Sequence, residues 1–327
     1  LYNLIWQPLE KHLDGVKTVY YGVDGLLHQL SFAAVSMTGE VNLSQQYNMV
    51  QLSSTAALIN LNNVDITRDF LLVGGVDYSY NTNNAVPEGM SFSLLNLESI
   101  KRSATTHSRG ENWTYLPGTK KEVDLIRNLT EKSKNVTVLS GKLATEEHLK
   151  NLSGNSPDVL HIATHGFFFE NLNQSKKKID NEPIYKVSED PMLRSGLLLS
   201  GGNYAWVNAV NPFEREDGIL TALEIANLNL KNTNLVVLSA CETGLGDIEG
   251  SEGVYGLYRA FKMAGVKSII MSLWKVPDNE TTEFMELFYT NWLADKEINE
   301  AFRQTQLTMM KVYKDDPSKW AGFVLIN

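Results

Sequence analysis

The sequence predicts an α/β fold in which a mostly parallel sheet is covered by helices on both faces. Short, nearly continuous apolar runs of the kind found in buried parallel strands occur at residues 69–76, 158–164 and 233–240. Segments with apolar residues at helical spacing follow these runs, so strands and helices alternate along the chain. With 327 residues, the chain is long enough to bury such a sheet.

We expect residues 1–65 to form an N-terminal extension and residues 66–327 to form the main domain. The extension is predicted to begin with a short helix at residues 4–12 and to continue with a hairpin. The hairpin strands would cover residues 16–21 and 26–35, because the intervening Gly-Val-Asp-Gly sequence favours a turn.

The main domain begins with the predicted strand at residues 69–76, which contains two glycines near its end and leads into a loop. Residues 77–117 are rich in Asn, Ser, Gly and Thr, so we expect a long loop. Helices are then predicted at residues 119–129 and after Thr145, a helix cap, and strands at residues 136–139 and 158–164.

The second half of the chain continues the alternation. Residues 170–190 are polar and charged, which predicts an exposed loop. Strands are expected at residues 193–199, 233–240 and 266–273, and helices at residues 220–226, 253–263, 281–293 and 298–312. The helix at 220–226 would be opened by Asp217 or Thr221.

The net charge and the apolar runs of the sequence indicate which classes of molecule the protein binds. A formal net charge of −9 argues against a surface that neutralises many nucleic-acid phosphates or anionic lipids, so we expect protein partners and no nucleic acid or membrane. No apolar run approaches the roughly 20 residues of a membrane span, and the first residues do not resemble a signal peptide. A cytoplasmic location is expected. One cysteine excludes an intrachain disulfide and a multi-cysteine metal site.

The candidate chemistry lies at the ends of two predicted strands. His165 and Cys241 are 76 residues apart, but each directly follows a strand, and adjacent parallel strands would bring them together. An imidazole beside a thiol removes its proton and creates the nucleophilic thiolate. The backbone N–H groups of Gly166 and Cys241 are candidates for holding the oxyanion of an acyl-transfer intermediate. No third catalytic side chain is indicated.

These residues also allow other interpretations. A cysteine at the end of an apolar strand is often a buried core residue, and His161, within the strand, is more typical of a structural histidine. His161 and His165 have the spacing of a zinc pair only on a helix, and the segment reads as strand. The glycines after Cys241 lack the phosphate-loop pattern. We expect no metal and no cofactor.

Four segments together resemble a known family. LHIATHGFF (160–168), DGILTALEI (217–225), LVVLSACETGLGDIEGSEGVYGLYRAF (235–261) and AGVKSIIMSLWKVPD (264–278) are similar to CHAT peptidases, which are caspase-like cysteine peptidases related to separases, gingipains and caspases. The resemblance extends weakly to the start of the chain and to WAGFVLI (320–326). It implies a caspase-like fold, a catalytic histidine at His165 and a catalytic cysteine at Cys241.

The resemblance also suggests where substrate binds. SLWKVPDNE (272–280) resembles the separase segment in which an acid lines the pocket for a basic side chain, and Asp278 matches that acid. Trp274 lies in the same segment, and Asp77 follows the first strand of the main domain, so both are further substrate-binding candidates. An Asp at 278 could instead cap a helix.

The leading hypothesis is therefore a cysteine endopeptidase, a hydrolase that cuts protein substrates with a His-Cys dyad. The resemblance implies regulation by an upstream sensor, an attached tetratricopeptide-repeat domain or a partner, in bacterial (including antiviral) defence or signalling. Two alternatives stay open: a caspase-like protein-interaction module without catalysis, and a Cys-His acyltransferase or amidase.

Overall fold

The centre of the protein is an eight-stranded sheet. The computed structural model describes residues 1–37, 41–60, 69–80, 112–131, 135–169, 188–208, 216–240, 247–248, 254–294 and 296–327. In spatial order the strands are β1 (Thr18–Gly22), β2 (Asn48–Leu52), β13 (Phe323–Ile326), β12 (Ser268–Ser272), β9 (Leu235–Ser239), β5 (Val159–Ala163), β3 (Asp69–Val76) and β4 (Asn135–Gly141). Neighbouring strands are parallel except β12 and β13.

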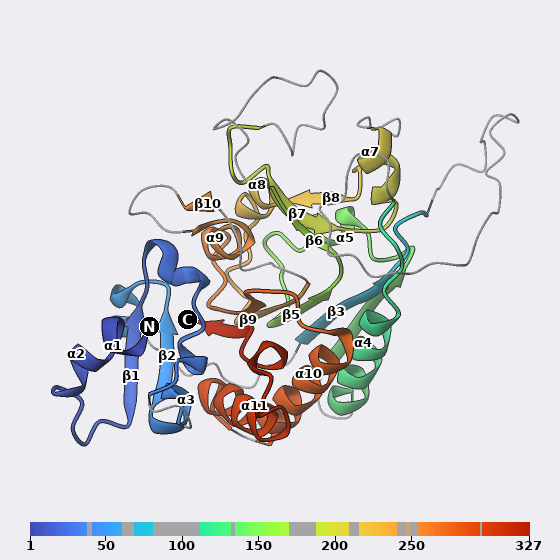
Figure 1. Cartoon of the computed structure of the whole chain (residues 1–327). Coiled ribbons are helices and arrows are strands. Elements are labelled where there is room, and N and C mark those ends of the chain that lie inside the picture. The colour runs from blue at the N-terminus through green and yellow to red at the C-terminus, as the bar shows by residue number, and fades with distance from the viewer. Residues whose placement is uncertain are drawn as a thin grey trace, which may run out of the picture.

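Helices cover both faces of this sheet (Figure 1). One face carries α4 (Pro117–Thr130), α10 (Asp278–Leu293) and α11 (Ile298–Val312); the other carries α8 (Ala222–Ala226) and α9 (Leu257–Met263). Side chains alternate between the two cores: in β5, Leu160 and Ile162 belong to one core, and Val159 and Ala163 to the other. The predicted α/β class, with a mostly parallel sheet between helices, is confirmed.

A smaller antiparallel sheet lies beside the α8 and α9 face. It consists of β6 (Gly166–Phe168), β7 (Ser195–Leu198) and β8 (Ile219–Thr221), and β7 lies in the middle. The short helices α5 (Glu146–Lys150) and α7 (Gly202–Asn208) lie near it, and β10 (Asp247–Ile248) pairs with β11 (Val254–Tyr255). The sequence did not predict α7, β6 or β8: β6 and β8 have three residues each, too few to show a period, and no cap was recognised for α7.

The hairpin predicted near the N-terminus is wrong. β1 pairs in parallel with β2, and η1 (Gly25–Gln29) and η2 (Phe32–Ala34), both 3₁₀ helices, occupy most of the expected second strand. The Asp24 side chain accepts a hydrogen bond from the Gly25 N–H at 2.8 Å and so caps η1 instead of completing a turn.

The predicted N-terminal helix is present as two short pieces, α1 (Tyr2–Ile5) and α2 (Gln7–Glu10). Pro8 at the start of α2 lacks an N–H group and therefore cannot continue the helical hydrogen bonding of α1. Trp6 between them is buried in a small separate core, whose members are Trp6, Phe32, Val35, Leu43 and Tyr47. The helix α3 (Leu43–Gln46) supplies Leu43 and leads into β2.

The N-terminal part is joined to the main sheet through β2 and β13. Ile326 is paired with Gln51, the Asn327 N–H donates to the Gln51 carbonyl, and the Ser53 N–H donates to the Asn327 carbonyl. The 3₁₀ helices η3 (Thr55–Asn60) and η5 (Pro317–Lys319) complete the secondary structure of these two segments. The expected boundary at residue 65 lies outside the described residues, so the domain division stays a prediction.

The two glycines of β3 allow α4 to approach it closely. A Cβ atom on Gly74 would lie 2.6 Å from Val123 Cγ2 and 2.7 Å from the Thr119 carbonyl oxygen. Gly75 has a φ of 63°, which favours glycine, and its N–H donates to Thr119 Oγ1 at 2.9 Å. The glycines therefore set the distance between α4 and the strand that leads into the candidate site.

The predicted helix caps are present. Thr145 caps α5 by accepting from the His148 N–H, and Thr221, rather than Asp217, forms a capping box with Glu224 at the start of α8. Residues 81–111 and 170–187, which make up most of the two predicted loops, lie outside the described residues.

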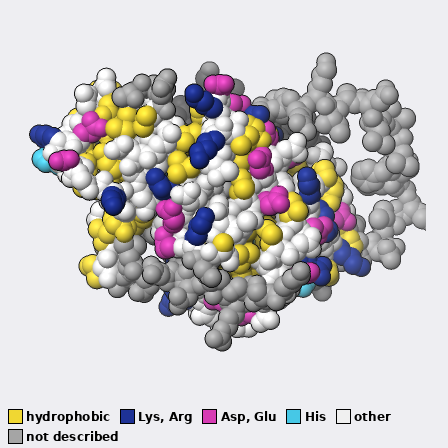
Figure 2. Space-filling view, turned by 90° about the horizontal axis from the view of Figure 1, so that it is seen from below, with side chains coloured by type: hydrophobic (Ala, Val, Ile, Leu, Met, Phe, Trp, Pro, Cys, Tyr) yellow, Lys and Arg dark blue, Asp and Glu magenta, His cyan; other side chains and the backbone are white. Residues whose placement is uncertain are grey.

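In the part of the chain that the structure describes, no helix has the length and hydrophobicity of a membrane-spanning segment. Figure 2 shows one face of the molecule, on which positive, negative and hydrophobic side chains are interspersed rather than gathered into a field of one sign.

Candidate functional site

The candidate site lies at the carboxyl ends of β5 and β9. These neighbouring strands are parallel, and Ala163 in β5 is paired with Ser239 in β9. His165 and Cys241 each follow one of these paired residues by two positions. Cys241 itself, and with it the proposed oxyanion N–H of Cys241, lies outside the described residues.

The ring of His165 is held by a backbone carbonyl. His165 Nε2 lies 2.8 Å from the carbonyl oxygen of Thr114. A carbonyl only accepts, so Nε2 must carry the hydrogen of this bond, and in the neutral ring the lone pair is then on Nδ1. The imidazole is thus oriented with a defined basic nitrogen, as a general base requires.

Two aromatic rings contact the imidazole of His165. Tyr78 lies 5.0 Å and Trp113 4.7 Å from it, between ring centroids. Trp113 in turn packs edge-on against Trp206 of α7 at 5.0 Å. These contacts, together with the bond to Thr114, restrict the orientation of the ring, which stays partly exposed.

The hydroxyl of Tyr78 also supports the backbone at the strand end. It hydrogen-bonds to Thr164 Oγ1 at 2.9 Å and accepts from the His165 N–H at 3.3 Å. Asp77, the residue before Tyr78 and a substrate-binding candidate from the sequence, is exposed, and its carboxylate accepts a hydrogen bond from the Ser79 N–H at 3.2 Å. The loop after β3 therefore contributes Tyr78 to the support of His165, and a substrate-binding role for Asp77 stays a prediction.

Asn203 of α7 connects the segments that support His165. Its Oδ1 accepts from the Trp113 N–H at 2.7 Å, and its Nδ2 donates to the Trp113 carbonyl at 3.0 Å. Its own N–H donates to the Tyr78 carbonyl at 3.0 Å. A buried amide thus fixes Trp113 and Tyr78 relative to each other, and with them the Thr114 carbonyl that holds His165.

A cavity of about 310 Å³ lies where α4 and α10 begin. It is lined by Pro117, Gly118, Lys121, Pro277, Asp278 and Asn279. Its first lining residue in the chain, Pro117, is three residues beyond Thr114. Asp278 is exposed and lies in the first turn of α10, where a negative charge also complements the helix dipole.

Trp274 is not among the residues that line this cavity. It is half-buried, its Nε1–H donates to the Ser318 carbonyl at 2.9 Å, and it packs against Gly322. Those contacts give it a structural role between β12 and the segment before β13. A substrate-binding role for Trp274 stays a prediction.

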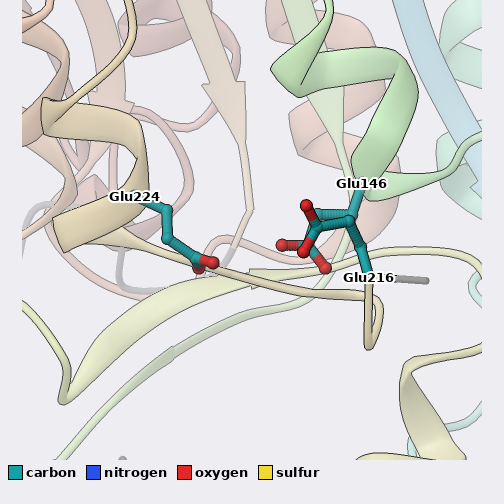
Figure 3. Close-up of side chains that lie close together, drawn as sticks. All are labelled: Glu146, Glu216 and Glu224. Carbon is teal, nitrogen blue, oxygen red and sulfur yellow. The ribbon is translucent and has the colours of Figure 1, made fainter. Parts of the chain in front are cut away.

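A group of carboxylates on α5, on α8 and before β8 lies close together. Glu146, Glu216 and Glu224 have oxygen atoms within 4.8 Å of one another, close enough to share a metal ion (Figure 3). However, the ammonium of Lys150 contacts all three, at 2.7 Å, 2.7 Å and 2.8 Å respectively. A fixed cation of the protein therefore already occupies the position that a metal would take.

Comparison with known proteins identifies the family. The model of the CHAT domain family matches residues 1–327, the whole of this chain. The chain belongs to the CHAT domain family. Two relatives, the tetratricopeptide repeat protein 28 of Mus musculus and that of Homo sapiens, are each 35% identical to this CHAT domain over 113 residues. The match covers 33% of this chain and only 4% of either relative's length.

The fold of the CHAT domain also resembles solved structures. The Arg specific cysteine proteinase gingipain R matches with a TM-score of 0.54 at 10% identity, over 99% of this chain and 66% of that one. The Saccharomyces cerevisiae separase-securin complex matches with a TM-score of 0.49 at 11% identity, over 92% of this chain and 14% of that one. At this identity the gingipain match shows a shared fold.

Several residues of the CHAT domain site were not found from the sequence. Tyr78, Trp113, Thr114 and Asn203 all support His165, directly or through one another. Trp113 is a large aromatic residue within a polar stretch, a pattern that could have indicated a buried contact in this loop. The role of Thr114 is made by its backbone, so no side-chain pattern could reveal it.

His161 has the structural role that the sequence indicated. It is fully buried, its Nε2 lies 2.8 Å from Glu122 Oε1, and its Nδ1 lies 3.1 Å from the hydroxyl of Tyr289. Burial, and then the charge of Glu122, raise the pKa of Tyr289 well above its usual value, so this hydroxyl keeps its proton. His161 belongs to a strand, β5, and not to a helical zinc pair.

Proposed function

We propose that this CHAT domain is a cysteine endopeptidase with Cys241 as nucleophile and His165 as base. His165 Nδ1 takes the thiol proton, the thiolate attacks the carbonyl carbon of a peptide bond, and the proton then passes to the leaving amine as the C–N bond breaks. Water hydrolyses the resulting thioester and releases Cys241.

The observation that carries this proposal is the bond from His165 Nε2 to the Thr114 carbonyl. This bond leaves Nδ1 as the basic nitrogen and orients the ring, and a surface histidine without a catalytic role needs neither. The register of β5 and β9 supports the same proposal, because adjacent parallel strands are roughly 5 Å apart and both residues follow paired positions.

Gly166 is the proposed oxyanion donor from the histidine side. The Leu198 N–H donates to the His165 carbonyl, so this pair is a hydrogen-bonded one in the antiparallel ladder of β6 and β7. Bonded and non-bonded pairs alternate in such a ladder, so the next residue, Gly166, directs its N–H away from β7. This orientation supports a role in binding an oxyanion beside the strand end.

We further propose that Asp278 favours a basic side chain before the cleaved bond. The carboxylate lines a cavity of about 310 Å³ near the segment that holds His165, and gingipain R, which shares the fold, is described as Arg specific. Lys121 lines the same cavity, and its positive charge would weaken that preference, so removing Asp278 and removing Lys121 should change the preference in opposite directions.

The proposed regulation comes from outside the described residues. The named relatives are tetratricopeptide repeat proteins, and the match spans a small part of them. We propose that an attached repeat or sensor region, or a partner, controls the endopeptidase in defence or signalling.

A peptidyl probe that reacts with thiols tests the proposal. Because the chain has one cysteine, labelling reports Cys241 alone. We expect labelling and cleavage by the wild-type chain, and loss of both in Cys241→Ala. His165→Ala should lose cleavage while circular dichroism and thermal unfolding show an intact fold. Wild-type cleavage rates in either variant would refute the dyad.

The same experiment separates the two alternatives. An interaction module would bind peptides without labelling at Cys241. A small-molecule amidase or acyltransferase would be labelled but would show no selectivity among peptidyl probes.

A further inference from the structure

A buried polar network joins three elements that carry the candidate site. The carboxylate of Glu122 in α4 has Oε1 2.8 Å from His161 Nε2 in β5, and Oε2 accepts from Ser239 Oγ in β9 at 2.9 Å. Glu122 is 2% exposed and His161 is fully buried. One carboxylate therefore binds both strands at once, one through each oxygen.

Stability alone is a poor explanation for this network. Removing a carboxylate from water costs several kcal/mol, and well-packed apolar residues of similar volume often stabilise a fold as much or more. The surrounding core is rich in such residues, including Val123 and Ile126 of the same helix. What the carboxylate adds is direction, because a hydrogen bond has a preferred angle whereas the hydrophobic effect is non-directional.

The elements that Glu122 fixes lead directly into the site. His161 precedes His165 by four residues, Ser239 precedes Cys241 by two, and Glu122 follows Thr114 by eight. Ladder hydrogen bonds already hold β5 against β9. The position of α4 along these strands, and so of the Thr114 carbonyl against His165, depends on contacts such as those of Glu122.

We propose that Glu122 is a positioning residue for the His165 and Cys241 pair, acting through His161 and Ser239. This inference rests on the proposed function, since it assigns a role in the same reaction. Glu122 does not line the cavity beside Asp278. Its loss should therefore change the chemical step and leave substrate binding nearly unchanged.

Three variants test the role. Glu122→Leu removes both bonds, and Ser239→Ala removes the bond to β9. Glu122→Gln keeps the length of the side chain and can still make both bonds, if its oxygen accepts from His161 and its NH2 group donates to Ser239 Oγ. We expect kcat to fall roughly 10- to 100-fold in Glu122→Leu, because small displacements of reacting groups have effects of this size. We expect a smaller fall in Ser239→Ala, a value near wild type in Glu122→Gln, and KM nearly constant throughout.

Ser268→Ala is the matched control. Ser268 is also a buried strand serine, and its hydroxyl donates to Asn327 Oδ1 at 2.9 Å, but it lies at the opposite end of the sheet, at the start of β12. Thermal unfolding should show a similar loss of stability in Ser239→Ala and Ser268→Ala, with kcat lowered only in the former. Equal kcat values in these two variants would overturn the positioning role.

A second readout does not need a substrate. The rate of Cys241 alkylation by iodoacetamide should fall in Glu122→Leu and in Ser239→Ala toward the rate of His165→Ala. If the wild-type chain reacts no faster than His165→Ala, the proposed dyad fails and the positioning role with it. If the wild type reacts faster and Ser239→Ala matches it, only the positioning role fails, and this holds even where Glu122→Leu does not fold.

Discussion

The carboxylates around Lys150 predict an unusual dependence of stability on pH. Glu146 is 1% exposed, and burial raises its pKa from 4.5 to about 7 although Lys150 contacts it. In the unfolded chain this carboxyl ionises at its ordinary pKa. Between these two values the folded protein binds more protons than the unfolded one, so the free energy of unfolding falls as the pH rises.

The size of the effect follows from the shift. Each pKa unit corresponds to about 1.4 kcal/mol, so the rise from 4.5 to about 7 lowers the free energy of unfolding by about 3 kcal/mol at alkaline pH. Glu146→Gln stays neutral at all pH values and still offers an oxygen to the Gly218 N–H, which donates to Glu146 at 2.9 Å. We therefore expect Glu146→Gln to be more stable than wild type at pH 8 and similar to it at pH 4.5.

Urea unfolding of both proteins between pH 4.5 and pH 8.5 measures this difference. Glu224→Gln is the control of opposite sign: burial alone would raise the pKa of Glu224, but bonds from Lys150 and Thr221 outweigh burial and lower it. Its ionised form is thus stabilised by folding, and Glu224→Gln should be less stable than wild type at pH 8. A free-energy difference between wild type and Glu146→Gln that does not change with pH would refute the reasoning.

Three further predictions concern the site and the packing around it. Tyr78→Phe removes the hydroxyl that hydrogen-bonds to Thr164 and to the His165 N–H. We expect the free energy of unfolding to fall by about 1–3 kcal/mol and kcat to fall as well. A kcat equal to that of the wild type would show that Tyr78 does not support His165. Asp278→Asn should lower the rate of cleavage after Arg or Lys relative to cleavage after neutral residues, and Lys121→Gln should raise it. Peptides that differ only at the residue before the cleaved bond measure this ratio. An unchanged ratio in both variants would refute the proposed pocket. Gly74→Ala places a methyl group 2.6 Å from Val123 Cγ2 and should lower the free energy of unfolding by about 1–3 kcal/mol, as measured with urea. Gly22→Ala is the control and should change this free energy little, because the nearest atoms to its methyl group would be 3.8 Å and 3.9 Å away.

The parts of the fold that repeat a simple period could be predicted from the sequence. β3 covers Asp69–Val76 and α11 covers Ile298–Val312, as the apolar patterns indicated, because a buried strand and an amphipathic helix each impose a period on the residues. The predicted hairpin at the N-terminus is wrong because the residues of its expected second strand form η1 and η2 instead of a partner for β1. β1 instead pairs with β2, about 30 residues later, and local patterns do not encode such pairing.

The candidate site divides in a similar way. His165 could be found because it follows a strand and matches a family motif, whereas its supporters come from three segments that are distant in sequence. Tyr78, Trp113 and Asn203 contact His165 or one another only in the folded chain. The bond that fixes the histidine tautomer uses the Thr114 carbonyl, which every residue type possesses.

The position of β13 at the end of this sequence, beside β2 in the sheet, makes the order of synthesis matter. Residues 18–52 attach to the main sheet through Phe323–Ile326 and Asn327, which leave the ribosome about 270 residues later. One edge of β2 therefore stays unpaired until all the residues between β2 and β13, and β13 itself, have been made. A ribosome-stalled chain that stops before residue 323 should expose β2 to proteases, and release of a chain that includes β13 should protect it.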